Sequence, residues 1–140
     1  VPVITINGEP AMLPMMIFEQ GDPRHLRTYQ EKRDLVDRSA KYSLKLFDYI
    51  AMNDRLIAYT EKLAEIFRPF DYGRFEFRVD FATGEIRLLE INLNCNLWSE
   101  KVFGRAAVAA GFSQAELIET IVAESMMRQL VAVGARQHAA

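Results

Sequence analysis

The feature that most constrains the fold is a predicted acidic hairpin between positions 72 and 92. Two runs of alternating polar and apolar residues, Tyr72–Phe81 and Glu85–Asn92, flank a short turn at 82–84 that ends in glycine. Such alternation is typical of half-buried strands, and a three-residue turn with a left-handed glycine joins antiparallel strands. The sequence therefore predicts an antiparallel ladder whose first pair is Phe81 opposite Glu85.

In that ladder two glutamates face each other. Counting back from the turn places Glu76 opposite Glu90, and Arg74 opposite Asn92. Directly opposed residues have Cβ atoms about 4.5–5.5 Å apart, and like charges so placed destabilise the ladder. Either one carboxyl group takes up a proton or a cation lies between the two.

These residue types suit a magnesium–phosphate site. Mg²⁺ usually binds one or two carboxylates together with phosphates and water, and the arginine guanidinium matches the geometry of a phosphate. The alternative is an ordinary solvated strand face, on which Arg74 or Arg78 pairs with Glu76.

The remaining sequence predicts an α+β fold with a mainly antiparallel sheet flanked by helices. A charged, weakly periodic stretch at 24–45 predicts irregular structure with at most one short helix. The other expected elements are a hairpin of Val1–Ile6 and Met12–Phe18 around Asn7-Gly8, a helix from Asn53 or Asp54 to about Phe67, a helix Val102–Ala110 stopped by Gly111, a helix capped by Ser113 and Glu116 that reaches about Val131–Val133, and a frayed tail at 134–140.

Composition narrows the functional class. A length of 140 residues suits a single domain, and a net charge of -2 gives no basic bias toward nucleic acid. The lone Cys95 excludes an internal disulfide and has no histidine near it in the sequence, so we expect a buried or incidental thiol in a reducing compartment. No apolar run approaches the roughly 20 residues that span a bilayer. We therefore expect a cytoplasmic protein without nucleic-acid or membrane partners, and Val1 in place of Met suggests a processed chain or a piece of a longer one.

The segment YGRFEFRVDFATGEIRLLEINLN resembles the closing hairpin of the ATP-grasp ligases, close to the D-alanine–D-alanine ligase pattern. In that pattern an Arg-x-Asp strand, a short turn and a Leu-Glu-x-Asn strand follow one another. VFGRAAVAAGFSQAELIETIV is similar to the helical end of those ligases, and the resemblance extends back to NGEPAMLP. It is weakest at Leu26–Asn53. The resemblance implies that the chain is the C-terminal lobe of an ATP-grasp catalytic domain.

The resemblance also implies roles for the hairpin residues. Glu76, Glu90 and Asn92 would bind metal, and the last two would also contact the nucleotide. Arg74 would be the catalytic arginine that stabilises a tetrahedral intermediate. Asp80 is the alternative first metal carboxylate, because the triplet RVD matches Arg-x-Asp as well. The implied cofactors are ATP and two Mg²⁺ ions, with Mn²⁺ as a substitute.

Two loops complete the implied site. In TYQEKRD, Lys32 and, second to it, Arg33 are the expected phosphate contacts. The loop Asn92–Lys101 would border the pocket of the amine acceptor. There Asn96 takes the place of the glycine in a Pro-Gly pair, and Lys101 that of the serine in a Ser-Leu pair. Both departures argue against D-alanine as the acceptor, and asparagine cannot adopt every conformation open to glycine.

In this family ATP phosphorylates a carboxylate and an amine then attacks the acyl phosphate. The expected partners are therefore a small-molecule carboxylate, a small-molecule amine and the N-terminal lobes of the same protein, with a homodimer as a further expectation. The chain alone would be an incomplete enzyme. A non-catalytic ATP-grasp-derived scaffold or binding domain and a glutathione-synthetase-like peptide ligase are the alternatives.

Overall fold

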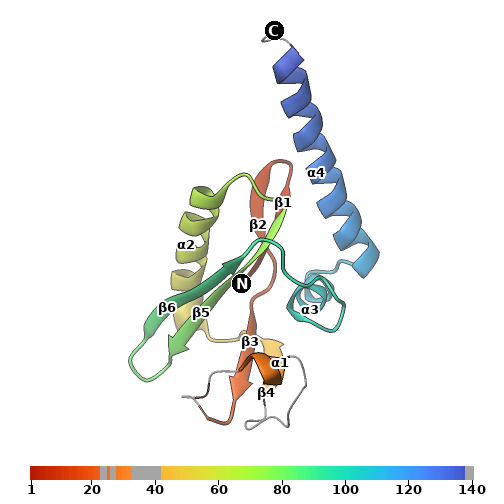
Figure 1. Ribbon diagram of the computed structural model, residues 1–140. Coiled ribbons are helices and arrows are strands. Elements are labelled where there is room, and N and C mark those ends of the chain that lie inside the picture. The colour runs from red at the N-terminus through yellow and green to blue at the C-terminus, as the bar shows by residue number, and fades with distance from the viewer. Residues whose placement is uncertain (23–24, 26–27, 33–41, 138–140) are drawn as a thin grey trace.

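The computed structural model describes residues 1–22, 25, 28–32 and 42–137, and it has the predicted α+β fold (Figure 1). A four-stranded antiparallel sheet has the strand order β2-β1-β5-β6, and a two-stranded sheet pairs β3 with β4. In chain order the elements are β1 (Pro2–Ile6), β2 (Glu9–Met12), β3 (Met16–Gln20), α1 (Tyr29–Lys32), β4 (Tyr42–Leu46), α2 (Ile50–Phe67), β5 (Tyr72–Asp80), β6 (Glu85–Asn92), α3 (Val102–Ala109) and α4 (Gln114–Gln137).

The first hairpin turns at Asn7-Gly8, as predicted. Both residues have positive φ, 53° and 80°, which is the backbone of a two-residue hairpin turn. The expected returning strand Met12–Phe18 is wrong, because the chain splits it into two strands. β2 pairs with β1 and stops at Met12, whereas β3 pairs with β4 in the second sheet. Pro14 lies between them, where a missing N–H would leave a gap in a continuous ladder.

The charged stretch at 24–45 contains more structure than expected. Its described part includes the short helix α1, which was predicted in kind, and the strand β4, which was not. β4 aligns Leu44 with Phe18 and Leu46 with Met16. An apolar alternation therefore exists in this segment, but the surrounding charges hide it.

The helix α2 begins at Ile50, earlier than the capping residues Asn53 and Asp54 predicted. Its N-cap, Tyr49, makes no side-chain capping hydrogen bond, so the sequence carries no capping signal there. The helix ends before Arg68, as expected for a residue that precedes proline. The buried positions of α2 are Leu56, Thr60 and Ala64, four residues apart on one face, whereas Ile66 is 73% exposed.

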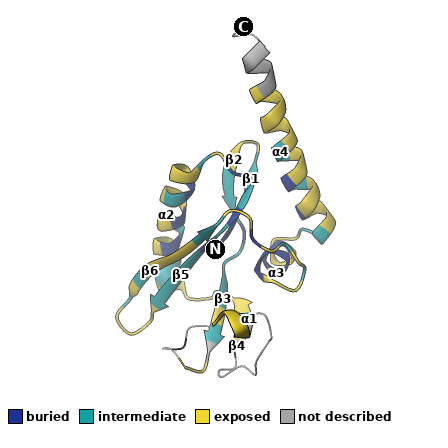
Figure 2. Ribbon diagram, in the orientation of Figure 1, coloured by how far each residue is buried: buried dark blue, intermediate teal, exposed yellow. Residues whose placement is uncertain are grey.

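The core lies on both faces of the four-stranded sheet, because successive strand residues point to opposite sides. Val3 packs with Phe75 and with Ala64 of α2. Its neighbour Ile4 packs with Phe103 of α3 and Leu117 of α4. Helix α2 thus covers one face, and α3 with the first turns of α4 covers the other (Figure 2). On this second face the helices leave the hairpin end of the sheet uncovered (Figure 1).

The two last helices follow the predicted signals at their junction. Gly111 has φ 89° after α3. The Ser113 Oγ accepts a hydrogen bond from the Glu116 N–H at 3.2 Å, and Glu116 Oε2 accepts one from the Ser113 N–H at 2.7 Å. This capping box holds the pKa of Glu116 below its ordinary value, chiefly through the Ser113 N–H. Helix α4 then runs to Gln137, beyond the expected end at Val131–Val133, while 138–140 lie outside the described residues.

Among the described residues, no single helix is long and apolar enough to cross a membrane. Helices α3 and α4 meet that length and composition only when they are counted together, and the chain bends by 103° between them.

Candidate functional site

The hairpin of β5 and β6 contains two irregularities that offset each other. Asp80, not Phe81, is the residue opposite Glu85, so the turn has one residue more than the sequence predicted. The Gly84 N–H closes it by donating to the Asp80 carbonyl oxygen at 2.7 Å. The predicted Phe81–Glu85 pair is therefore wrong, although Gly84 does take the expected positive φ, at 72°.

The second irregularity is a β-bulge in β6. Phe77 pairs with Leu88, but the next pair is Glu76 with Glu90, which leaves Leu89 as an extra residue. This extra residue restores the register that the longer turn had shifted. The predicted pairs Glu76–Glu90 and Arg74–Asn92 are both present.

Glu76 has one negatively charged and one positively charged neighbour. Across the ladder is Glu90, which is exposed, and on its own strand is Arg74, whose Nη2 lies 2.5 Å from Glu76 Oε1. The side chains of Arg74 and Glu76 are only 22% and 32% exposed. The Arg74–Glu76 ion pair is one of the two that we expected if the hairpin has an ordinary solvated strand face. The other expected pair, Arg78 with Glu76, is not formed, and no described carboxylate pairs with Arg78. A metal at Glu76 would therefore have to compete with the Arg74 guanidinium.

The other two candidate metal ligands of the hairpin, Asp80 and Asn92, accept hydrogen bonds from backbone N–H groups in the turns that follow them. Asp80 Oδ1 accepts hydrogen bonds from the N–H groups of Ala82 and Thr83, which lower the pKa of Asp80. It lies four residues from Glu76, or about 13 Å along the strand, so it is far from the glutamate pair. Asn92 Oδ1 accepts from the Asn94 N–H at 3.0 Å and keeps a second lone pair.

A cavity of about 540 Å³ lies between β3 and β5. β1 is registered with β5 only as far as Arg74, so the second half of β5 borders the cavity with an edge that β1 does not cover. Glu19, Arg74, Glu76 and Arg78 contribute the charged groups. Glu90, Asn92, Asn96 and Lys101 are not part of its lining.

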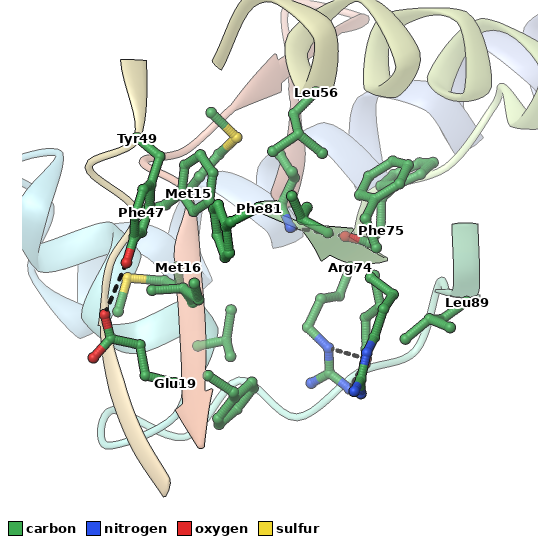
Figure 3. A pocket seen from close by; sticks show the side chains of 18 residues that line it. Met15, Met16, Glu19, Phe47, Tyr49, Leu56, Arg74, Phe75, Phe81 and Leu89 are labelled. Atoms are coloured by element: carbon green, nitrogen blue, oxygen red, sulfur yellow. Dashed lines mark hydrogen bonds and ion pairs between the residues drawn. The ribbon is translucent and has the colours of Figure 1, made fainter. Parts of the chain in front are cut away.

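One side of the cavity is aromatic. Phe47, Tyr49 and Phe81 pack together, with ring centroids 5.1 Å apart for Phe47–Tyr49 and 4.4 Å apart for Tyr49–Phe81. The Tyr49 hydroxyl donates to Glu19 at 3.2 Å, and Glu19 also pairs with Lys45. Figure 3 shows these rings on one side of the pocket and Arg74 with Leu89 on the other. The sequence analysis missed this aromatic group, although the alternating run LKLFDY that contains two of its members could have indicated it.

In the loop after β6, both predicted acceptor residues, Asn96 and Lys101, contact Trp98. Asn96 Oδ1 accepts a hydrogen bond from the Trp98 N–H at 2.7 Å. Among the described residues only Asn7 is a non-glycine with positive φ, so Asn96 does not occupy a conformation that requires glycine. Lys101 is exposed, and its Nζ lies 5.4 Å from the centroid of the Trp98 ring.

Comparison with known proteins adds one finding. No protein-family model matches the sequence, and no curated protein matches it. Among solved structures, the D-alanine–D-alanine ligase from Bacillus anthracis, complexed with ATP, matches over 94% of this chain with a TM-score of 0.66. The chain has the fold of part of a D-alanine–D-alanine ligase. At 15% identity the likeness concerns the fold, and the chain spans 39% of the length of that ligase.

Within this ligase-like fold the donors suit a metal that phosphates help to bind. No group of three or more His, Cys, Asp or Glu side chains is placed to hold an ion anywhere in the described chain. Glu76, Glu90 and Asn92 instead offer two carboxylates and an amide. The two carboxylates match the one or two that Mg²⁺ usually takes beside phosphates and water, and the amide oxygen is a third, neutral donor. The residues therefore fit Mg²⁺ bound together with a nucleotide better than Mg²⁺ alone.

Two other candidates of the ligase-like fold have little described geometry. Lys32 ends the helix α1, and its side chain is not described. Arg33 lies outside the described residues.

The thiol of Cys95 is buried, as expected. Its residue is 5% exposed and packs in the core with Ile4 and Phe103. Burial raises the pKa of Cys95, which keeps it protonated and weakly nucleophilic near neutral pH.

Proposed function

We propose that this chain is the C-terminal lobe of an ATP-dependent carboxylate–amine ligase. One observation carries the proposal: Arg74 and Glu76 line a cavity of a ligase-like fold, and in the ladder they face Asn92 and Glu90. An opposed pair of glutamates lowers the stability of the free ladder, so a cation in the functional complex is a physical reason for its presence.

In the proposed site Glu76, Glu90 and Asn92 hold two Mg²⁺ ions, or Mn²⁺, with the phosphates of ATP. The metal would neutralise phosphate charge during phosphoryl transfer. Glu76 and Glu90 would bind the metal from neighbouring strands, and the Asn92 amide would add a neutral oxygen ligand. The ladder holds all three backbone positions, so little backbone conformational entropy remains to be lost when the nucleotide binds.

Arg74 is the proposed catalytic residue. Its guanidinium carries five N–H donors in a planar fork. A tetrahedral intermediate carries an oxyanion, which such a group stabilises. Arg74 would contact the reacting groups once its ion pair with Glu76 opens.

The substrates would be a small-molecule carboxylate and an amine. Lys32 and Arg33 would contact phosphate, and Asn96 with Lys101 would border the acceptor. The other lobes of a longer protein would complete the nucleotide pocket, in keeping with the 39% of the ligase that this chain spans. A cytoplasmic location and a homodimer stay predictions.

A second function is favoured by the ion pair of Arg74 with Glu76. This pair neutralises one of the two opposed glutamates without any metal. A non-catalytic domain that kept the ATP-grasp fold for binding or scaffolding could keep the same pair. A glutathione-synthetase-like peptide ligase remains an alternative identity for the enzyme.

Titration with Mg²⁺ separates these functions. In the full-length protein with ATP present, added Mg²⁺ should shift the backbone amide signals of Glu76, Glu90 and Asn92. The amide of Glu85, on the same strand but at the hairpin tip, is the matched control and should stay nearly unchanged. If millimolar Mg²⁺ moves none of the three signals, the metal site is wrong and the scaffold function is favoured.

A further inference from the structure

Arg78 is a cation whose place in the hairpin nothing described so far explains. It lies directly opposite Arg87 in the ladder, and like charges so placed destabilise a sheet. Arg87 is neutralised by Glu85, with hydrogen bonds of 2.9 and 3.0 Å. Among the described residues Arg78 instead makes one long hydrogen bond of 3.4 Å, to the carbonyl oxygen of His25. Within the described chain no carboxylate pairs with it.

The positive charge of Arg78 is also unbalanced within the cavity. The other charged side chains of the cavity are paired: Arg74 with Glu76, and Glu19 with Lys45 from outside the lining. Arg78 is half-buried and is the cationic lining residue left without an anion among the described residues. A half-buried charge without a counter-ion costs free energy, which an anionic ligand would remove.

The position of Arg78 along β5 indicates which part of a ligand it meets. It lies two residues from Glu76, or about 6.6 Å along the strand, in the direction of the hairpin tip. Beyond it, at Phe81, is the aromatic group with Phe47 and Tyr49. Arg78 therefore lies between the proposed metal carboxylates and a surface on which a planar ring can stack.

A nucleotide matches this order of groups. With its outer phosphates at Glu76 and Glu90 and its base against the aromatic group, its phosphate nearest the sugar passes Arg78. We propose that Arg78 binds this sugar-proximal phosphate. The inference rests on the proposed function, because it takes the outer phosphates to lie at the glutamate pair. The guanidinium fork suits a phosphate better than a point charge would.

The test compares nucleotides that share or lack that phosphate. In the full-length protein, calorimetric titration with AMP, ADP and adenosine is carried out for the wild type and for Arg78→Ala. A hydrogen bond between charged groups is worth about 10- to 100-fold in affinity. AMP and ADP should therefore bind about 10- to 100-fold more weakly to Arg78→Ala, while adenosine changes less than twofold. Arg78→Lys should recover part of the loss.

Arg87→Ala is the matched control, since it removes the opposite arginine from the same ladder. It should leave AMP affinity unchanged, and thermal unfolding of each variant checks that the hairpin is intact. If Arg78→Ala binds AMP as tightly as the wild type, or weakens adenosine as much as AMP, the phosphate contact is wrong. No AMP binding by the wild type at millimolar concentration also overturns it. Arg78-dependent AMP binding without Mg²⁺-dependent ATP turnover would support the contact and count against the ligase function alone.

Discussion

Glu90→Gln is expected to lower the ATP turnover of the full-length protein by at least about 1,000-fold, because a lost metal ligand removes several kcal/mol of transition-state stabilisation. Glutamine keeps the shape of the side chain and removes its charge. Glu90 is exposed and faces another glutamate, so the fold should lose no stability and could gain some. The measurement is ADP formation at saturating Mg²⁺ beside thermal unfolding.

Glu85→Gln is the control for this change. Glu85 lies on the same strand and is also exposed, but it pairs with Arg87 at the hairpin tip. Its substitution should leave turnover within about twofold, as for other changes away from the reacting groups. Unchanged turnover in Glu90→Gln would contradict the metal role of the glutamate pair.

Gly104→Ala should destabilise the protein by about 3 kcal/mol or more, the upper range for overpacking a rigid site. Gly104 is buried in α3, where an added Cβ would overlap the backbone of Ser99 and lie 2.6 Å from its carbonyl carbon. Backbone atoms cannot move aside as a flexible side chain can. The close approach also seats the loop of Asn96 and Lys101 against the helix, so the substitution should disturb the proposed acceptor side as well.

Chemical denaturation of the full-length protein measures this effect, and Gly21→Ala provides the matched glycine control. A Cβ at Gly21 would meet no atom within 4 Å, and Gly21 does not have positive φ. Its unfolding free energy should change by less than about 1 kcal/mol. If Gly104→Ala unfolds with the same midpoint as Gly21→Ala, the tight packing of α3 on the loop is wrong.

The hairpin illustrates how far sequence alone could predict the candidate site. Alternation identified both strands and brought Glu76 opposite Glu90. Yet that register was obtained without two real features, the longer turn after Asp80 and the bulge at Leu89. The sequence did contain a signal for the longer turn. An aspartate readily accepts hydrogen bonds from the backbone N–H groups two and three residues after it, and Asp80 does so with Ala82 and Thr83. The bulge had none, since an ordinary leucine occupies it.

The other elements that the sequence analysis misplaced have two causes. The start of α2 lacks a capping residue that would mark it. The strand β4 depends on pairing with β3, which is distant in the sequence. The second sheet brings Phe47 and Tyr49 to Phe81 and thereby builds the aromatic side of the cavity. Such a group of aromatic rings arises from packing between segments that are distant in the sequence, and a local sequence pattern does not indicate which distant segments pack together.

The most direct test is a crystal structure of the full-length protein with Mg²⁺ and a non-hydrolysable ATP analogue. The account predicts an ion about 2.0–2.1 Å from oxygens of both Glu76 and Glu90, with Arg74 no longer paired to Glu76. A nucleotide-bound structure in which Arg74 keeps that ion pair and the metal contacts neither glutamate would contradict it.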